Sequence, residues 1–188
     1  MKHLVIFASG SGSNAENIFN YFKENKAVNI DLIATNNAQA GVIERAKRLN
    51  IACKVFDKRD LNNGDWQSWS HLLQADLIIL AGFLLKIPAD FITKFPNKII
   101  NIHPALLPKY GGKGMYGNRV HQAIVVNKEK ESGISIHYVN ENYDEGALIF
   151  QKSFALDADE TPDSLAQKIH ELEYKHFPEV IDKLLKDV

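Results

Sequence analysis

Short, mostly apolar runs alternate with segments of helical character over about the first hundred residues, and this alternation restricts the fold more than any other feature. Strands that are apolar on both faces are typical of a parallel sheet covered by helices on both sides. We therefore predict an α/β fold, doubly wound and Rossmann-like, with a mostly parallel central sheet. The predicted strands of this part lie at 4–8, 30–34, 52–56, 77–81 and 99–102.

The later part of the chain differs, because the predicted strands at 133–139 and 148–154 follow one another without a helix between them. Strands joined by a short loop pair in antiparallel fashion, so we expect both to extend one end of the sheet. No repeat or linker-like stretch interrupts the pattern, so we predict a single domain over 1–188, composed of the halves 1–100 and 101–188.

The predicted helices begin and end at polar or turn-forming residues. Thr161 and Pro162 have the sequence expected at a helix start, and Pro178 is expected to kink or split the helix that follows. Asn118 is the predicted cap of the helix at 118–126, and the polar stretch 57–64 is predicted to be a surface loop. The remaining predicted helices lie at 15–23, 41–49, 66–73 and 89–95.

The charge balance and the cysteine content exclude several classes of protein. The net charge of −1 gives no basic surface field for nucleic acid, and no stretch combines clustered Lys and Arg with aromatic residues. No apolar run approaches the roughly 20 residues that a membrane span needs. The single cysteine, Cys53, cannot form an internal disulfide, which fits a reducing compartment. We therefore expect a cytoplasmic protein that binds neither nucleic acid nor membrane.

A glycine-rich turn, Ser-Gly-Ser-Gly-Ser-Asn at 9–14, joins the first predicted strand to the first helix. This arrangement directs backbone N–H groups and the positive end of the helix toward an anion. The turn also fits the loose dinucleotide pattern, but the second strand runs into Thr35-Asn36-Asn37, without the acidic residue that would hold a ribose. We therefore favour a phosphate site over a nicotinamide site, and a tight turn without a ligand stays an alternative.

Two polar side chains stand at the end of the predicted strand at 99–102. Asn101 and His103 are two positions apart, so both point to the same face, and Pro104 follows directly. The carboxyl ends of parallel strands carry the ligand-binding groups of open α/β sheets. An amide and an imidazole at such a place suit an oxygen that gains negative charge during a reaction. The alternative is structural, with Asn101 in a turn and His103 a half-buried histidine whose hydrogen bonds are satisfied.

Asp144, in a later acidic loop, completes a candidate catalytic set with Asn101 and His103. A carboxylate within about 4–6 Å of an imidazole raises its pKa, so we expect His103 to donate a proton near neutral pH. Ser135 and His137 share one face of a strand as possible supports, and His137 is the alternative proton carrier. No histidine pair has the helical spacing of metal ligands, so no metal site is predicted.

A run with four glycines in seven residues occupies 111–117. Such a run is too flexible for a helix or strand. Its flanks belong to the same strand–helix pattern, which argues against a linker between domains. We predict a mobile loop close to the site.

Four motifs, in order along nearly the whole chain, resemble the phosphoribosylglycinamide formyltransferase family of de novo purine synthesis. They are Ser-Gly-Ser-Gly-Ser-Asn at 9–14, Leu-Ala-Gly-Phe at 80–83, Asn-Ile-His-Pro-Ala-Leu-Leu-Pro at 101–108, and Ser-Ile-His-Tyr-Val at 135–139 with Asp144. The Asn-x-His-Pro motif with a distal aspartate is highly specific to folate-dependent formyl-handling enzymes. Methionyl-tRNA formyltransferase carries an additional C-terminal domain and formyltetrahydrofolate hydrolase an additional N-terminal one, so we expect the purine enzyme from the 188 residues.

This resemblance implies transfer of a formyl group from 10-formyltetrahydrofolate to the amine of glycinamide ribonucleotide, without a metal. The implied catalytic residues are Asn101, His103 and Asp144, and the implied partners are these small molecules, with a monomer or a homodimer as the assembly. Leu85 departs from the family, because many relatives carry arginine there. By the same resemblance, the phosphate is bound by Gly12, Ser13 and Asn14, and the ribose by Glu173. The residues that the resemblance implies for the folate are Arg59, Leu84, Leu85, Lys86, Ile87, Asn101 and the 140–144 loop.

Two other classes of function stay open from the sequence. The first is a phosphate- or nucleotide-binding domain without transfer activity, in which 10–14 binds the ligand and Asn101 and His103 are structural. The second is a dinucleotide oxidoreductase, which the missing acidic residue after the second strand disfavours. Loss of the formyl group from the folate in the presence of glycinamide ribonucleotide separates the three hypotheses.

Overall fold

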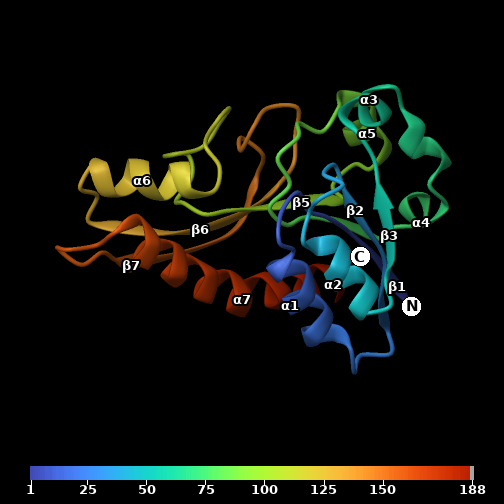
Figure 1. Cartoon of the computed structure of the whole chain (residues 1–188), viewed down its shortest axis with the longest axis horizontal. Helices are drawn as coiled ribbons and strands as arrows, with labels where there is room; N and C mark the ends of the chain where they lie inside the picture. Colours follow the sequence, from blue (N-terminus) through green and yellow to red (C-terminus); the bar gives the residue numbers. More distant parts are fainter. Residues whose placement is uncertain (187–188) are drawn as a thin grey trace.

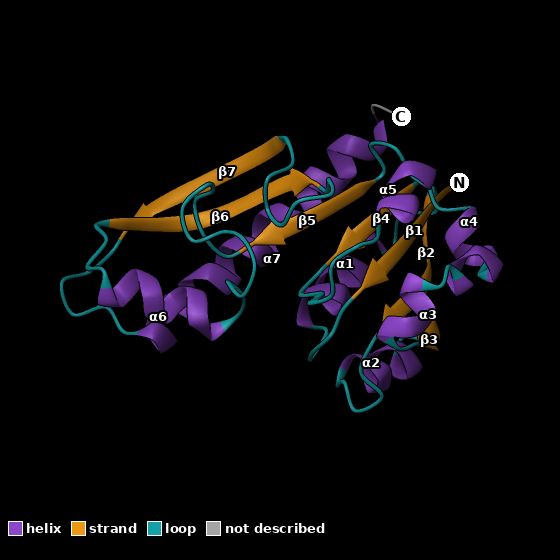
Figure 2. Ribbon diagram, turned by 90° about the horizontal axis from the view of Figure 1, so that it is seen from above, coloured by secondary structure: helices purple, strands orange, loops and turns teal. Residues whose placement is uncertain are grey.

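The computed structural model describes residues 1–186 and contains one seven-stranded sheet with helices on both faces (Figure 1 and Figure 2). The strand order is β3-β2-β1-β4-β5-β6-β7. Pairing is parallel from β3 to β5 and antiparallel from β5 to β7. The predicted α/β fold, with antiparallel strands at one end, is confirmed. The strands are β1 (Lys2–Phe7), β2 (Val28–Thr35), β3 (Ala52–Val55), β4 (Leu77–Leu80), β5 (Ile99–His103), β6 (Glu131–Tyr138) and β7 (Leu148–Ala155).

Two groups of helices cover the two faces of the sheet (Figure 2). No helix within residues 1–186 combines the length and the apolar composition that a membrane span needs. One face carries α1 (Ser13–Phe22), α2 (Val42–Arg48), α6 (Asn118–Val126) and α7 (Pro162–Lys186). The other face carries α3 (Lys58–Asn62), the 3₁₀ helix η1 (Asp65–Ser68), α4 (Ser70–Leu73) and α5 (Ala89–Lys94).

The alternation of side chains along each strand divides the core between these two groups. In β1, Leu4 and Ile6 join the core under α1, α2, α6 and α7, whereas Val5 and Phe7 join the core under α3, η1, α4 and α5. All four side chains are fully buried. Because such a strand is apolar on both faces, neither face can be left to solvent, and helices cross over on both sides.

The antiparallel end of the sheet projects beyond the parallel part (Figure 1 and Figure 2). β6 pairs with β5 only from Ser135 to Tyr138, so its first residues pair with β7 alone. α7 packs against this extension and against α6, and its later turns reach α1. The last helix therefore connects the antiparallel extension to the parallel part of the sheet.

Three local predictions are wrong. The predicted loop at 57–64 contains α3, because Asp57 and Asp60 each accept from the other's backbone N–H and form a capping box. The helix predicted over 66–73 is divided into η1 and α4 at Trp69, whose ψ of 97° is extended. Asn118 does not cap α6; the cap position is Gly117, with φ 53° and ψ −137°, a backbone conformation that glycine permits.

α7 continues through Pro178 as one helix, so of the two expected outcomes, a kink or a split, the split is wrong. Proline has no N–H, and a proline inside a helix leaves the carbonyl four residues earlier without its helical donor. That carbonyl belongs to Tyr174, and it accepts instead from Asn17 Nδ2 of α1 at 2.8 Å. The bond missing within α7 is thus replaced by a bond between α7 and α1.

Candidate functional site

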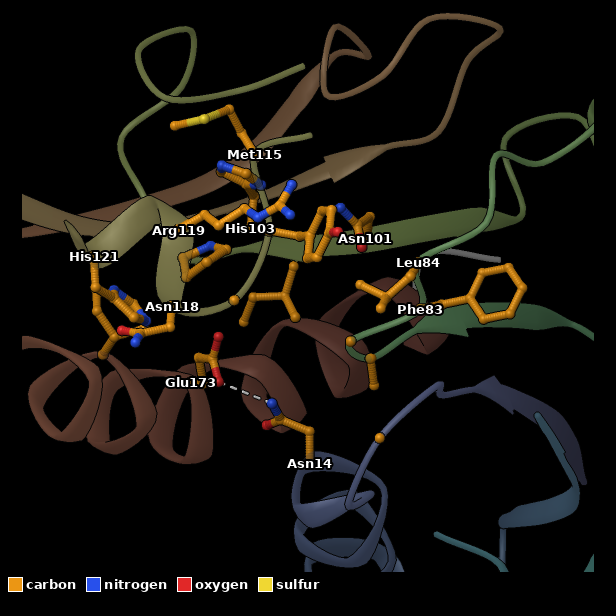
Figure 3. Close-up of a pocket in the computed structure, with 18 of the residues that line it drawn as sticks. Asn14, Phe83, Leu84, Asn101, His103, Met115, Asn118, Arg119, His121 and Glu173 are labelled. Carbon is orange, nitrogen blue, oxygen red and sulfur yellow. Dashed lines mark hydrogen bonds between the residues drawn. The ribbon is translucent and has the colours of Figure 1, made fainter. Parts of the chain in front are cut away.

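A cavity of about 670 Å³ lies at the carboxyl ends of β1, β4 and β5 (Figure 3). The strand order reverses between β1 and β4, and open α/β sheets bind ligands at this switch point. Segments far apart in the chain form the cavity wall: the turn at 10–14, the turn at 81–84, the end of β5 with Pro104, the 112–119 segment and α7.

The turn at 10–14 is held against α2. Val42 N–H donates to the Gly10 carbonyl at 3.1 Å, and Arg45 Nε donates to the Ser11 carbonyl at 2.8 Å. Gly12 has φ +78°, and a Cβ there would lie 2.9 Å from the Val42 Cα, so only glycine fits this contact. The first turn of α1 is thereby fixed at the cavity wall, where its N–H groups and the helix dipole favour an anion.

Asn14, His170 and Glu173 form a hydrogen-bonded group between α1 and α7. Figure 3 shows the bond from Asn14 to Glu173. Asn14 Nδ2 donates to Glu173 Oε2 at 2.9 Å, and His170 Nδ1 lies 3.0 Å from the same oxygen. This hydrogen bond raises the pKa of His170, although partial burial opposes the increase. Glu173 is only 5% exposed, and both of these contacts use its Oε2. Glu173 also lines the cavity, and a carboxylate oxygen there can accept from hydroxyl groups of a ligand.

Asn101, His137 and Asp144 meet between this cavity and a second one. Asn101 Nδ2 lies 3.1 Å from His137 Nε2 and 3.5 Å from Asp144 Oδ1. His137 Nδ1 donates to the Tyr138 carbonyl at 2.8 Å, so Nε2 carries the lone pair that accepts from the amide. The three side chains come together because Asn101 and His137 pair directly across β5 and β6.

His103 is buried between two acceptors. Its Nδ1 is 3.6 Å from Asp144 Oδ2, and its Nε2 is 2.8 Å from the Tyr110 carbonyl. A carbonyl oxygen only accepts, so Nε2 carries a hydrogen. Asp144 Oδ2 also accepts from Gly112 N–H at 2.9 Å, and the carboxylate thus connects His103 to the glycine-rich loop.

Burial lowers the pKa of His103 below its ordinary value, so the predicted increase is wrong. The charge of Asp144 and the hydrogen bond to the Tyr110 carbonyl act in the opposite direction, but the loss of hydration outweighs them. The sequence shows the Asp144 carboxylate but not the burial of the His103 ring, and the direction of the pKa shift depends on that burial. An oxyanion that forms beside the ring raises the pKa of His103 again, because it stabilises the charged imidazole.

Asp144 is ionised at neutral pH. Burial opposes its ionisation, but the nearby His137 imidazole, the charge of His103 and the N–H of Gly112 together hold the pKa of Asp144 below its ordinary value. The residue has φ +56°, a conformation that aspartate adopts more readily than most residues. Its two oxygens each lie 3.6 Å from an imidazole, one from His103 and the other from His137.

Ser135 is absent from both cavity walls and holds the turn that follows His103. Its Oγ donates to the Ala105 carbonyl at 2.6 Å and accepts from Leu107 N–H at 3.0 Å. Gln151 Nε2 of β7 donates to the same Oγ at 2.9 Å. Ser135 therefore supports the site through the backbone of this turn.

The residues expected to contact folate divide between the two cavities. Leu84 lines the first cavity, whereas Leu85, Lys86 and Ile87 line the second, which measures about 60 Å³. Lys86 Nζ lies 6.0 Å from the centre of the Tyr143 ring, and Tyr143 lines both cavities. The turn after β4 and the 140–144 loop thus face each other across the second cavity.

Arg59 lies apart from both cavities. It belongs to α3, its side chain is 87% exposed, and its guanidinium contacts the Asp57 carboxylate at 3.1 Å. The structure therefore does not bring Arg59 to the other predicted site residues. Its neighbours in sequence were expected to form a loop, whereas α3 leaves its side chain in solvent.

The glycine-rich loop lies on the wall of the first cavity, as expected from the sequence. Met115, from this loop, and Arg119, from the start of α6, lie near His103 in Figure 3. The loop therefore stands between solvent and the proposed catalytic residues. Among residues 1–186, no three His, Cys, Asp or Glu side chains are grouped so that they could hold a metal ion.

Sequence reasoning missed two histidines of this cavity, His121 and His170. His121 is 4% exposed, burial lowers its pKa, and its Nδ1 is buried without a hydrogen bond within residues 1–186. His170 could have been predicted from the sequence, because it lies three positions before Glu173 on a predicted helix and therefore shares a helix face with it. His121 could not have been predicted as a cavity residue, because its position depends on how α6 packs against α7.

The sequence matches the family described as Formyl transferase over residues 2–181. It is 38% identical to the chloroplastic phosphoribosylglycinamide formyltransferase of Arabidopsis thaliana, over 99% of this chain and 66% of the plant protein. The chain therefore spans about two thirds of the length of that relative. It is 36% identical to the phosphoribosylglycinamide formyltransferase of Bacillus subtilis (strain 168), over 98% of this chain and 95% of the bacterial protein.

The structure is also similar to a solved one, the phosphoribosylglycinamide formyltransferase from Anaplasma phagocytophilum. The TM-score is 0.88 at 30% sequence identity, and the match covers 98% of this chain and 87% of the other. The similarity therefore extends over both the parallel strands and the antiparallel end of the sheet.

Proposed function

The chain belongs to the formyl transferase family, and on this basis we propose that it transfers a formyl group from 10-formyltetrahydrofolate to the amine of glycinamide ribonucleotide in de novo purine synthesis. The observation that carries the proposal is the position of Asn101, His103 and Asp144 on a cavity that also contains an anion-binding turn and Glu173. One part of the cavity offers groups for a sugar phosphate, and another offers groups for charge and proton transfer.

Formyl transfer forms a bond from the amine nitrogen to the formyl carbon, breaks the bond from that carbon to the folate nitrogen, and moves one proton from the amine to the folate nitrogen. The formyl oxygen carries negative charge between these steps. Asn101 Nδ2 donates to that oxygen. His103 Nδ1 takes up the proton that leaves the amine, donates it to the formyl oxygen while Asp144 stabilises the charged ring, and then gives it up to the folate nitrogen. To donate, Asn101 gives up its longer contact, 3.5 Å to Asp144, and keeps its hydrogen bond to His137.

The ribonucleotide lies along α1 and α7 in this proposal. Gly12, Ser13 and Asn14 bind the phosphate through the N–H groups of the first helical turn. Glu173 Oε1 accepts from the ribose hydroxyls, while Oε2 stays bonded to Asn14 and His170. The phosphate and the ribose are therefore fixed at one end, which leaves the amine to reach Asn101 and His103.

The reduced folate enters through the second cavity, between Leu85, Lys86, Ile87 and the 140–144 loop. Leu84 and Asn101 contact its reactive end where the two cavities meet. A volume of about 60 Å³ admits only part of a bicyclic ring, so the 140–144 loop moves outward when the folate binds. Arg59 takes no part, since it lines neither cavity.

The test is a transfer assay with the purified protein, 10-formyltetrahydrofolate and glycinamide ribonucleotide. We expect deformylated folate and formylated ribonucleotide in equal amounts. A control without the ribonucleotide measures hydrolysis, and a control with methionyl-tRNA as the acceptor measures the related transferase activity. Release of formate alone, formylation of tRNA alone, or binding of the substrates without transfer would each contradict the proposal.

We also propose that the protein acts in the cytoplasm, on small molecules, as a monomer or a homodimer. The cytoplasmic location is supported by the single cysteine, Cys53, which cannot form a disulfide within the chain. Sedimentation equilibrium distinguishes the two assemblies.

A further inference from the structure

Tyr110 connects the proposed catalytic histidine to the end of α6. Its φ is +57°, a left-handed conformation that bulky residues rarely adopt. Its backbone carbonyl contacts His103, whereas its phenol contacts Asn127 and Glu129, which follow α6. A residue in such a conformation needs contacts that overcome its backbone preference.

The phenol supplies these contacts. Tyr110 Oη donates to Glu129 Oε1 at 2.9 Å and accepts from Asn127 Nδ2 at 2.9 Å. Glu129 is itself held at the end of α6, where its N–H donates to the Ile124 carbonyl. The Tyr110 ring is partly buried against the core beside α6 and α7. Side chain and backbone of Tyr110 are therefore fixed together.

The carbonyl of Tyr110 determines which nitrogen of His103 can react. Nε2 donates to this carbonyl at 2.8 Å, so Nε2 is engaged in both the neutral and the charged ring. Nδ1 is left near Asp144 Oδ2, at 3.6 Å, and both residues line the first cavity. A proton that His103 takes or gives must therefore pass through Nδ1.

We propose that Tyr110 is a positioning residue: Asn127 and Glu129 anchor its phenol, and its carbonyl holds His103 as the Nε2–H tautomer with Nδ1 as the reactive nitrogen. The inference rests on the proposed function for the reaction itself, but the tautomer and its anchor can be measured in the free protein. The other titratable groups that act on His103 are Asp144, His137, Glu173 and His121, and none of them is replaced in the variants below.

Four variants separate the anchor from its surroundings. Tyr110→Phe removes the hydroxyl and keeps the ring. Glu129→Leu removes the acceptor, whereas Glu129→Gln keeps an oxygen that accepts from the phenol. Lys109→Ala is the control for the ion pair at Glu129: the Lys109 side chain is 69% exposed and contacts Oε1, which also accepts from the phenol, at 3.1 Å and Oε2 at 3.3 Å, but it makes no hydrogen bond with Tyr110.

NMR of protein labelled with ¹⁵N-histidine reads the tautomer and the pKa of His103, with His103→Asn to assign the signal. We expect the Nε2–H tautomer in the wild type, Lys109→Ala and Glu129→Gln. In Tyr110→Phe and Glu129→Leu we expect a mixture of tautomers and a lower pKa, because the carbonyl that favours the charged ring is no longer fixed. In these two variants kcat at neutral pH falls about three- to tenfold, and KM for the ribonucleotide stays within about twofold.

An Nδ1–H tautomer in the wild-type protein would overturn the proposal. An unchanged tautomer, pKa and pH–rate profile in Tyr110→Phe and Glu129→Leu would overturn it as well. If Tyr110→Phe does not fold, the comparison of Glu129→Leu with Glu129→Gln decides. A wild-type protein without transfer activity would contradict the proposed function instead, and the NMR comparison would still test the anchor.

Discussion

Asp144 is the residue on which the proposed proton transfer depends, because its oxygens lie 3.6 Å from both His103 and His137. Asp144→Asn keeps the shape and removes the charge. The pKa of His103, already lowered by burial, should fall further, because the carboxylate that opposed the decrease is gone. The measurement is kcat against pH for the wild type, His103→Asn, Asp144→Asn and the double variant. We expect a shifted profile in Asp144→Asn and losses that do not add.

Strictly additive losses, with an unmoved profile in Asp144→Asn, would show that the carboxylate and the imidazole of His103 act independently. His137 would then be the next proton carrier to test, because it lies at the same distance from Asp144.

Glu173 uses Oε2 in its bonds to Asn14 and His170, and the proposed function assigns Oε1 to the ribose. Glu173→Gln keeps the shape but weakens the acceptor, so KM for the ribonucleotide should rise about ten- to hundredfold with a smaller change in kcat. The pKa of His170 should fall, because the carboxylate raises it. Steady-state kinetics with both substrates check this, with KM for the folate as the internal control. An unchanged ribonucleotide KM at normal stability would leave Glu173 a structural role only.

At the scale of residues, the sequence predicted those site residues that can be recognised from their residue type and their position on a strand or loop. Asn101 and His137 were recognisable as polar side chains on strands, and Asp144 as a carboxylate in a nearby loop. The sign of the pKa shift of His103 was not predictable, because it depends on burial. Tyr110 was not predictable either, since it contacts His103 through a backbone carbonyl, a group that every residue has.

At the scale of elements, the turn between β1 and α1 contains two glycines with different requirements. In Gly12→Ala, the new Cβ would lie 2.9 Å from the Val42 Cα at φ +78°, so α1 and α2 must separate. Gly10→Ala is the matched control, because a Cβ there meets no atom within 4 Å. We expect Gly12→Ala to lower the free energy of unfolding by about 1–3 kcal/mol and Gly10→Ala to change it by less than about 0.5 kcal/mol.

Urea unfolding of the two glycine variants makes this comparison. Equal losses would mean that contact with Val42 is not what requires glycine at position 12. The same measurement must accompany any binding assay of Gly12→Ala. A weaker affinity for the ribonucleotide there can result from disturbed packing between α1 and α2 as well as from a lost contact with the phosphate.

A second prediction at this scale concerns the hydrogen bond from Asn17 of α1 to the Tyr174 carbonyl of α7. Asn17→Ala leaves the Tyr174 carbonyl without its side-chain donor and should lower the free energy of unfolding by about 1 kcal/mol. Pro178→Ala supplies a backbone N–H to the same carbonyl, so in that background Asn17→Ala should cost less. A double-mutant cycle by urea unfolding measures the difference. A coupling energy near zero would show that solvent satisfies this carbonyl equally well.

The sequence predicted strands better than short helices. Buried parallel strands leave unbroken apolar runs, and these are visible without knowledge of the fold. α3 has no apolar period, although Asp57 and Asp60 have the spacing of a capping box. The start of α6 depends on the backbone of Gly117, which no side-chain preference reveals.

At the scale of the whole molecule, two buried histidines make stability depend on pH. Burial lowers the pKa of His103 and His121 below 6.5. As the pH falls through about 6.5, the unfolded chain therefore binds protons that the folded chain does not, and the free energy of unfolding decreases. The raised pKa of His170 acts in the opposite direction, but its side chain is 52% exposed, which reduces its effect.

Urea unfolding between about pH 5.5 and 7.5 measures this dependence. His121→Gln should make the decrease smaller, because it removes one of the two groups. His71→Gln, at an exposed position in α4, is the matched control and should leave the decrease unchanged. If the free energy of unfolding decreases equally in the wild type and in His121→Gln, His121 does not contribute to the pH dependence of stability.

We propose that 1–188 forms one folding unit. Its support is the core under α1, α2, α6 and α7, which combines Leu4 and Ile6 of β1 with Ile169 and Ile181 of α7. The two halves expected from the sequence therefore share one interior, and neither half could keep its apolar surface covered alone.

Asn14 and Glu173 stand 159 positions apart and share a hydrogen bond. Protein synthesis begins at the N-terminus, so the ribosome exposes the anion-binding turn long before it has made α7. During that interval the carboxylate that is proposed to recognise a ribose does not yet exist. A loop of this length closes late, after other contacts have reduced its entropic cost. The proposed recognition of a ribose therefore depends on a contact that the growing chain can form only after α7 has been made.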